Sequence, residues 1–159
     1  MARIDHTLVV VEESGERLQA ELGVPPERIT VVGNTPSLRR LDDFAERPAP
    51  LVARPATPLR AVYLGLMEEA RGVRTVIEAA ARLKDREVPV DLTLIGDGRA
   101  RQDFEALARE RGLGGERFRS LGFVPYREAL QVVAESEVGL IPHLANESWN
   151  TTIPNQLFD

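Results

Sequence analysis

Short apolar runs alternate with longer stretches in which apolar positions lie three or four residues apart. Residues 59–65 (LRAVYLG) form an apolar run closed by glycine, which is typical of a buried parallel strand. Charged residues separate the apolar ones in the next stretch, at a spacing that predicts an amphipathic helix. Its inward positions are Val73, Val76, Ile77, Ala80, Ala81 and Leu83. Residues 90–95 then alternate as a second strand and end at Gly96. The sequence therefore predicts a strand–helix–strand unit.

A unit of this kind determines where its two glycine turns lie. Parallel strands joined by a helix take a right-handed crossover, so their carboxyl ends lie at one edge of the sheet. Gly65 and Gly96 each follow one of these ends. Open α/β sheets bind ligands at that edge. We therefore predict an edge that faces a phosphate or a nucleotide.

The same alternation continues to the end of the chain. It predicts helices over residues 99–111 and 127–135 and strands over 117–121 and 136–142. The inward positions of the two helices are Phe104, Leu107 and Ala108, then Leu130, Val133 and Ala134. A further helix begins at residue 155 and stops with the chain, so we expect the following strand and helix to lie outside this sequence. The prediction is an α/β fold with a Rossmann-like parallel sheet and helices on both faces, incomplete at both ends.

The first 46 residues carry a smaller strand–helix–strand pattern. We predict a strand in residues 7–11, Ser14 as the N-cap of a helix over 16–22 that Gly23 ends, and a strand over 29–32. Residues 37–46 predict one more helix. Two strands and a short helix do not make a stable domain, so we expect residues 1–46 to be the tail of an N-terminal domain. Residues 47–57 predict a proline-rich linker, and residues 58–159 a ligand-binding domain.

Composition narrows the classes of function. The formal net charge of −5 argues against a broad basic surface for nucleic acid. The absence of cysteine excludes a disulfide framework and fits a reducing compartment. No apolar run approaches the ~18 residues of a membrane span, and the N-terminus lacks a signal-peptide pattern.

Four segments should converge on the ligand edge, namely residues 65–72, 96–98, 122–126 and 150–159. Arg71 is the fixed cation of the first segment, either in reach of a diphosphate or a solvated residue at the helix start. Asp97 is either a turn former or a ligand contact. Phe123 and Val124 offer backbone groups to a nucleotide base, although Phe123 also fits a place in the core.

The last predicted helix would add groups of its own. Asn155 and Gln156 offer backbone N–H groups to a phosphate at its start. Asp159 could accept two ribose hydroxyls, or simply pair with the helix dipole. His6 and His143 have no cysteine or carboxylate at metal-ligand spacing, so we expect no metal site. No serine lies in a nucleophile elbow, and neither a GxGxxG fingerprint nor a P-loop is present.

These segments together resemble the retaining glycosyltransferases of the GT-B class, family 4 in particular. The first matching segment is ERITVVGN, which precedes the linker, and Gly65 with Arg71–Gly72 then opens the donor domain. VIEAAARL, LTLIGDG, LGFVPYREAL and SEVGLIP follow in family order, and TTIPNQLFD resembles a subgroup motif at a helix start. Residues 58–159 would then be most of the donor-binding domain, the C-terminal half of a GT-B architecture.

The resemblance implies a role for each matched residue. Arg71 would contact the donor diphosphate, Gly65 and Gly98 would line the donor cleft, and Phe123–Val124 would hold the base through backbone groups. Asn155 and Gln156 would lie under the phosphates, and Asp159 would take the place of the ribose-binding acid. Arg71 is the catalytic candidate, because it would neutralise the departing diphosphate.

Three positions depart from the family pattern. Leu66 stands where many members carry a second phosphate-binding arginine, Gln156 where this subgroup often has lysine, and Thr151 in place of the first acid of the paired-glutamate motif. The resemblance implies transfer from a nucleoside-diphosphate sugar to a glycan or lipid-linked acceptor, without cofactor or metal.

Two alternatives remain open at this point. One is a non-catalytic subunit or interaction module of a split transferase, and the other a nucleotide-sugar epimerase of the same fold. We expect a cytoplasmic protein able to contact the inner face of the membrane peripherally through the preceding domain. We also expect these 159 residues alone not to catalyse transfer.

Overall fold

The computed structural model describes residues 4–35, 58–145 and 154. These fall into two compact units, one containing residues 4–35 and the other residues 58–144, and each is described by itself. The predicted helix over 37–46, the linker over 47–57 and the helix start at 155 lie outside the described residues. So do Asn155, Gln156 and Asp159. The division into acceptor tail, linker and donor domain therefore stays a prediction.

The smaller unit is a strand–helix–strand motif. Strands β1 (Thr7–Val9) and β2 (Ile29–Val31) pair in parallel, and helix α1 (Glu12–Leu22) and a 3-10 turn (Pro26–Arg28) connect them. The predicted N-cap at Ser14 is wrong, because α1 begins at Glu12 and its N-cap is the extended residue Val11. Two acidic residues in the first turn suit the positive end of the helix dipole there.

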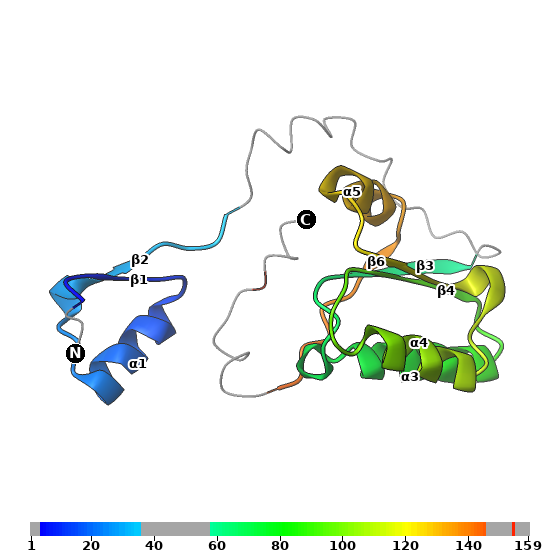
Figure 1. Ribbon diagram of the computed structural model, residues 1–159, viewed down its shortest axis with the longest axis horizontal. Helices are drawn as coiled ribbons and strands as arrows, with labels where there is room; N and C mark the ends of the chain where they lie inside the picture. The colour runs from blue at the N-terminus through cyan, green and yellow to red at the C-terminus, as the bar shows by residue number, and fades with distance from the viewer. Residues whose placement is uncertain (1–3, 36–57, 146–153, 155–159) are drawn as a thin grey trace. The chain divides into compact units, whose positions relative to one another are not determined.

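The larger unit contains a parallel sheet of four strands in the order β5-β4-β3-β6 (Figure 1). The strands are β3 (Leu59–Leu64), β4 (Val90–Ile95), β5 (Phe118–Gly122) and β6 (Val138–Gly139). Since all pairings are parallel, the carboxyl ends of the four strands lie at one edge. The predicted Rossmann-like α/β fold is confirmed.

Helices cover both faces of this sheet (Figure 1). α3 (Val73–Asp85) and α4 (Arg101–Glu110) pack on one face, and α5 (Tyr126–Ala134) packs on the other. The inward positions predicted for α3 are buried except Leu83, which is half-buried, and the three predicted for α4 are all buried. Among the described helices, none combines the length and the apolarity that crossing a bilayer requires.

Two details of burial differ from the prediction. β4 was expected to alternate, but Leu92, Thr93, Leu94 and Ile95 are all buried, because helices cover both faces at that end. The hydroxyl of Thr93 accepts a hydrogen bond from Arg119 at 3.1 Å, which compensates its burial. In α5, Ala129 is buried in place of Ala134, which is exposed at the last turn of the helix.

Candidate functional site

The turns that follow β3, β4 and β5 are hydrogen-bonded to one another at the carboxyl edge. The N–H of Gly65 donates to the carbonyl of Ile95 at 2.9 Å, and the N–H of Gly96 donates to the carbonyl of Gly122 at 2.8 Å. The N–H of Met67 donates to the carbonyl of Asp97, also at 2.9 Å. The prediction that these glycine turns meet on one side of the sheet is confirmed.

A pocket of about 420 Å³ opens between these turns and the start of α5. That volume is within the range of small-molecule sites. Leu64, Gly65, Leu66, Ile95, Gly96, Asp97, Phe123, Val124, Tyr126 and Ala129 line it. The pocket thus brings together three of the predicted site residues, namely Gly65, Phe123 and Val124. The side chain of Phe123 is 84% exposed, so the alternative that it belongs to the core is wrong.

The turn after β4 is built around Asp97 and Gly98. One carboxylate oxygen of Asp97 accepts a hydrogen bond from the N–H of Gly98 at 2.8 Å, so Asp97 acts as a turn former. A Cβ on Gly98 would overlap the backbone of Met67, so this position requires glycine for close packing. Gly98 is not among the residues that line the pocket, and its contact with a donor stays a prediction.

Arg71 lies at the end of a 3-10 turn (Glu69–Arg71) that leads from β3 into α3. Its side chain meets the segment that leaves β6, since Nη1 of Arg71 is 3.2 Å from Nε2 of His143. Arg71 is half-buried and is not among the residues that line the pocket, so its contact with a donor diphosphate stays a prediction. Sequence reasoning missed His143, which was treated as an isolated histidine. Its place just after Pro142, at the end of a predicted strand, was the signal that could have placed it at the same edge.

Burial and charge act together on the groups around Arg71. Burial raises the pKa of Tyr63 to about 12, and the positive charge of Arg71 opposes that rise. The Tyr63 hydroxyl is therefore neutral, and it donates to the carbonyl of Leu66 at 2.7 Å. Burial lowers the pKa of His143, and the charge of Arg71 lowers it further. The result is one permanent cation next to a neutral imidazole and a neutral phenol.

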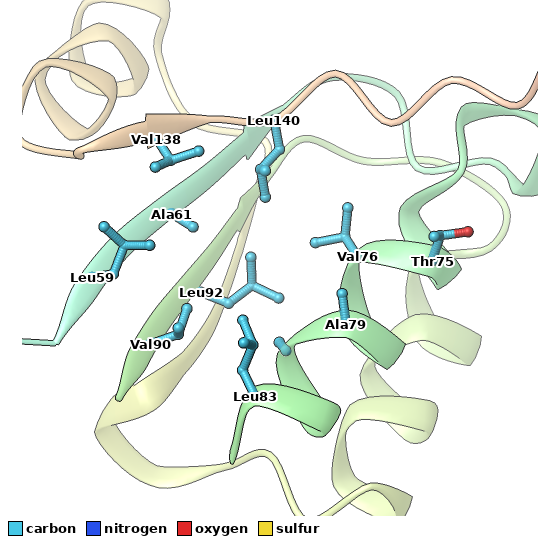
Figure 2. A pocket seen from close by; sticks show the side chains of 11 residues that line it. Leu59, Ala61, Thr75, Val76, Ala79, Leu83, Val90, Leu92, Val138 and Leu140 are labelled. Atoms are coloured by element: carbon cyan, nitrogen blue, oxygen red, sulfur yellow. The ribbon is translucent and has the colours of Figure 1, made fainter. Parts of the chain in front are cut away.

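A second pocket, of about 230 Å³, lies away from this edge, between α3 and the strands β3, β4 and β6 (Figure 2). Figure 2 shows Val76 of α3 and Leu92 of β4 facing each other across it, with Val138 and Leu140 on the β6 side. Of the described residues that line it, Thr75 alone carries a polar side chain. A charged or sugar ligand requires polar partners, so this groove does not suit the predicted donor.

Within the described ranges, no group of three or more histidine, aspartate or glutamate side chains is placed to hold a metal ion. The N–H groups of Gly65, Gly96 and Met67 are bonded within this edge, and the turn after β3 contributes the guanidinium of Arg71. A guanidinium is suited to binding a phosphate group.

Comparison with known proteins gives the same family as the sequence resemblance. The family model described as "Glycosyl transferases group 1" matches residues 58–158. The 2-deoxystreptamine glucosyltransferase of Streptomyces kanamyceticus is 28% identical over 152 residues, which cover 93% of this chain and 39% of that protein. The match to the α-D-kanosaminyltransferase of the same organism covers 36% of that protein. This chain therefore spans about two fifths of the length of each of these relatives.

Solved structures of glycosyltransferases share the fold. A glycosyltransferase of Rickettsia africae ESF-5 gives a TM-score of 0.64 at 12% identity, covering 91% of this chain and 39% of that one. S. aureus TarM G117R, in complex with fondaparinux, α-GlcNAc-glycerol and UDP, gives a TM-score of 0.56 at 13% identity. That match covers 76% of this chain and 22% of TarM. These relatives are named transferases, so neither the epimerase nor the non-catalytic subunit is favoured. The family model covers residues 58–158, which is well over half of this chain. The chain therefore belongs to the group 1 glycosyl transferases.

Proposed function

We propose that this chain carries the donor-binding part of a retaining glycosyltransferase that uses a nucleoside-diphosphate sugar. The observation that carries the proposal is the pocket of about 420 Å³ between hydrogen-bonded turns at the carboxyl edge, with the guanidinium of Arg71 in the turn that follows the same β3 strand. In this proposal the base lies against Phe123 and Val124, and the diphosphate lies at Arg71.

The proposed reaction exchanges one bond at the anomeric carbon of the sugar. The bond between this carbon and the diphosphate oxygen breaks, and the diphosphate leaves with the electron pair. The acceptor hydroxyl oxygen forms the new bond on the same face of the sugar and gives up its proton, which leaves with the diphosphate. Negative charge therefore grows on the diphosphate, and Arg71 stabilises it where it develops.

The rest of the donor site extends the proposal beyond the described residues. Asn155 and Gln156 would hold the phosphates through backbone N–H groups, Asp159 the ribose hydroxyls, and Gly98 the wall of the cleft. The donor is a substrate, and the proposal assigns no cofactor or metal to the reaction.

Relatives support the choice of substrates. A relative at 28% identity is named a glucosyltransferase, and a structure of the same fold is titled as a complex with UDP. We propose a glycan or lipid-linked acceptor, bound by a preceding domain of which residues 1–46 are the tail and 47–57 the linker. A cytoplasmic location with peripheral contact to the membrane through that domain belongs to the same proposal.

Isothermal titration with UDP, GDP and their sugars tests the donor site. We expect one nucleotide series to bind, and Arg71→Ala to abolish that binding while the far-UV circular dichroism stays unchanged. Arg82→Ala is the matched control, because Arg82 is an exposed arginine of α3 outside the site. Binding by the wild type that survives Arg71→Ala would contradict the assigned diphosphate position, and no binding of any nucleotide would contradict the function.

A further inference from the structure

The chain leaving β6 crosses closely over the start of α3. Gly72 has a φ of 74°, and a Cβ there would overlap the carbonyl oxygen of Pro142, so only glycine lets the two segments pass. The N–H of Leu140 donates to the carbonyl of Val62 at 2.8 Å and holds the same segment against β3. This crossing is what places His143 beside Arg71, the residue before Gly72.

The hydrogen bond between these side chains fixes the protonation of His143. A guanidinium has N–H donors and no acceptor, so Nε2 of His143 must accept from Nη1 of Arg71. The imidazole is therefore neutral, with its proton on Nδ1. A second proton, on Nε2, would set two cations 3.2 Å apart, which agrees with the lowered pKa of His143.

Binding of a sugar nucleotide would change the charge around Arg71 and His143. Its diphosphate is esterified at both ends and carries two negative charges, whereas Arg71 supplies one positive charge. Leu66 lines the pocket in the turn after β3, and its side chain carries no charge. An anion beside a histidine favours the imidazolium form. Among the described residues, His143 is a titratable group in direct contact with Arg71, at 3.2 Å, and could supply the second charge.

We propose that His143 is a second diphosphate-binding group, and that donor binding is coupled to its protonation. This inference rests on the proposed function. In the empty site His143 is neutral and orients Arg71. When the diphosphate binds, Nε2 takes up a proton from solvent and donates a hydrogen bond to a phosphate oxygen. Donor affinity then rises as pH falls through the pKa that His143 has in the complex.

Other charged groups of the neighbouring elements are engaged elsewhere, as far as the described residues go. The carboxylate of Glu69, in the same turn as Arg71, pairs with Arg74 of α3. The Tyr63 hydroxyl of β3 donates to the carbonyl of Leu66, and Asp97 accepts from Gly98. Glu68 precedes the turn and is the remaining acid beside it. Among the described residues, Arg71 is a charged group that lowers the pKa of His143, in addition to the effect of burial.

Proton NMR measures whether His143 takes up a proton when the donor binds. The chain has two histidines, so its spectrum contains two Cε1–H signals, and His143→Gln assigns them. We expect the pKa of His143 to lie below its ordinary value in the free protein. In Arg71→Gln this pKa should be higher, because the neighbouring positive charge is removed. Saturating UDP-glucose, or whichever sugar nucleotide of the panel binds, should also raise the pKa of His143 in the wild type. An unchanged titration on binding would overturn the proposal.

Calorimetry at about pH 5.5 and about pH 8 measures whether donor affinity depends on the protonation of His143. The donor itself keeps its charge in that interval, because a doubly esterified diphosphate does not titrate there. We expect the wild type to bind the sugar nucleotide about 3- to 10-fold more tightly at the lower pH. His143→Gln retains an acceptor for Arg71 but cannot become charged, so its affinity should not vary between the two pH values. His6→Gln is the matched control and should behave as wild type, because His6 belongs to the smaller unit.

The outcomes separate this inference from the proposed function. A wild type that binds equally at both pH values, or a His143→Gln variant that retains the pH dependence, overturns the role of His143 alone. Absence of any sugar-nucleotide binding at either pH overturns the proposed function together with this inference.

Discussion

The carboxylate of Glu137 accepts hydrogen bonds from the backbone N–H of Arg60 at 2.7 Å and from its guanidinium, through Nη2 at 2.6 Å and Nε at 3.1 Å. The N–H of Glu137 in turn donates to the carbonyl of Arg60 at 2.8 Å. Since β6 has two residues, these bonds extend its attachment to β3 by one position. The segment that carries His143 to the site is therefore anchored at its start by this pair.

Glu137→Gln should lower the stability of the larger unit at neutral pH. The hydrogen bonds from Arg60 lower the pKa of Glu137 to about 2 from an ordinary 4.5. A depressed pKa stabilises the folded state above the ordinary value, and this contribution is lost as pH falls from about 4.5 through about 2. Thermal unfolding at several pH values should thus show a deficit in the variant at pH 7 that closes in acid. Glu87→Gln, at an exposed glutamate after the end of α3, should show no deficit at either pH.

Gly98→Ala should destabilise the protein by about 1–3 kcal/mol, because the added methyl group displaces the backbone of Met67. The displacement also moves the turn that forms one wall of the donor pocket, so nucleotide affinity should fall. Gly114→Ala is the matched control, since a Cβ at Gly114 meets no atom within 4 Å and its φ of −174° is open to any residue. Urea unfolding of both variants checks this. Equal stability of the two would show that Gly98 has no packing role.

Much of the fold was predictable because β3 and β4 are largely apolar runs, each ended by a glycine turn. β3 and β4 lie within a residue of their predicted ranges, and the inward face of α4 was fully predicted. The errors arise where tertiary contacts override a local pattern. Successive residues of β4 from Leu92 to Ile95 are buried on opposite faces of the sheet, because helices cover both, and alternation along one strand does not reveal this.

The site was predictable as an edge but not as a set of contacts. Parallel pairing puts Gly65 and Phe123 at one pocket, which follows from topology alone. The meeting of Arg71 with His143 depends on how two segments 72 positions apart cross, and no local pattern encodes that crossing. The requirement for glycine at position 72, next to Arg71, has its cause in the carbonyl of Pro142.

Tyr63→Phe should destabilise the protein by about 1 kcal/mol. The Tyr63 side chain is fully buried, and its hydroxyl is bonded to the carbonyl of Leu66 at 2.7 Å. Removing the hydroxyl leaves that carbonyl without this donor and loosens the turn after β3. Spectrophotometric titration supplies a second measurement, because ionisation of one tyrosine near pH 12 in the wild type should be missing from the variant. A variant as stable as the wild type would contradict the assigned bond.

Leu66→Arg should strengthen donor binding about fivefold, or by about 1 kcal/mol. Leu66 is 44% exposed and lines the pocket, so a guanidinium there can reach the diphosphate without being buried in the core. The gain should shrink at high salt, because it is electrostatic. Leu66→Gln is the control for side-chain length and polarity without charge, and it should show no gain.

The same variant tests the charge balance of the site. If Arg71 and a charged His143 together neutralise the diphosphate, an arginine at position 66 supplies the second charge in advance. Donor binding to Leu66→Arg should then take up less of a proton, and its affinity should vary less between about pH 5.5 and about pH 8 than that of the wild type. Calorimetry in two buffers of different ionisation enthalpy measures the proton uptake directly. An uptake equal to that of the wild type would mean that the two positions act on different parts of the donor.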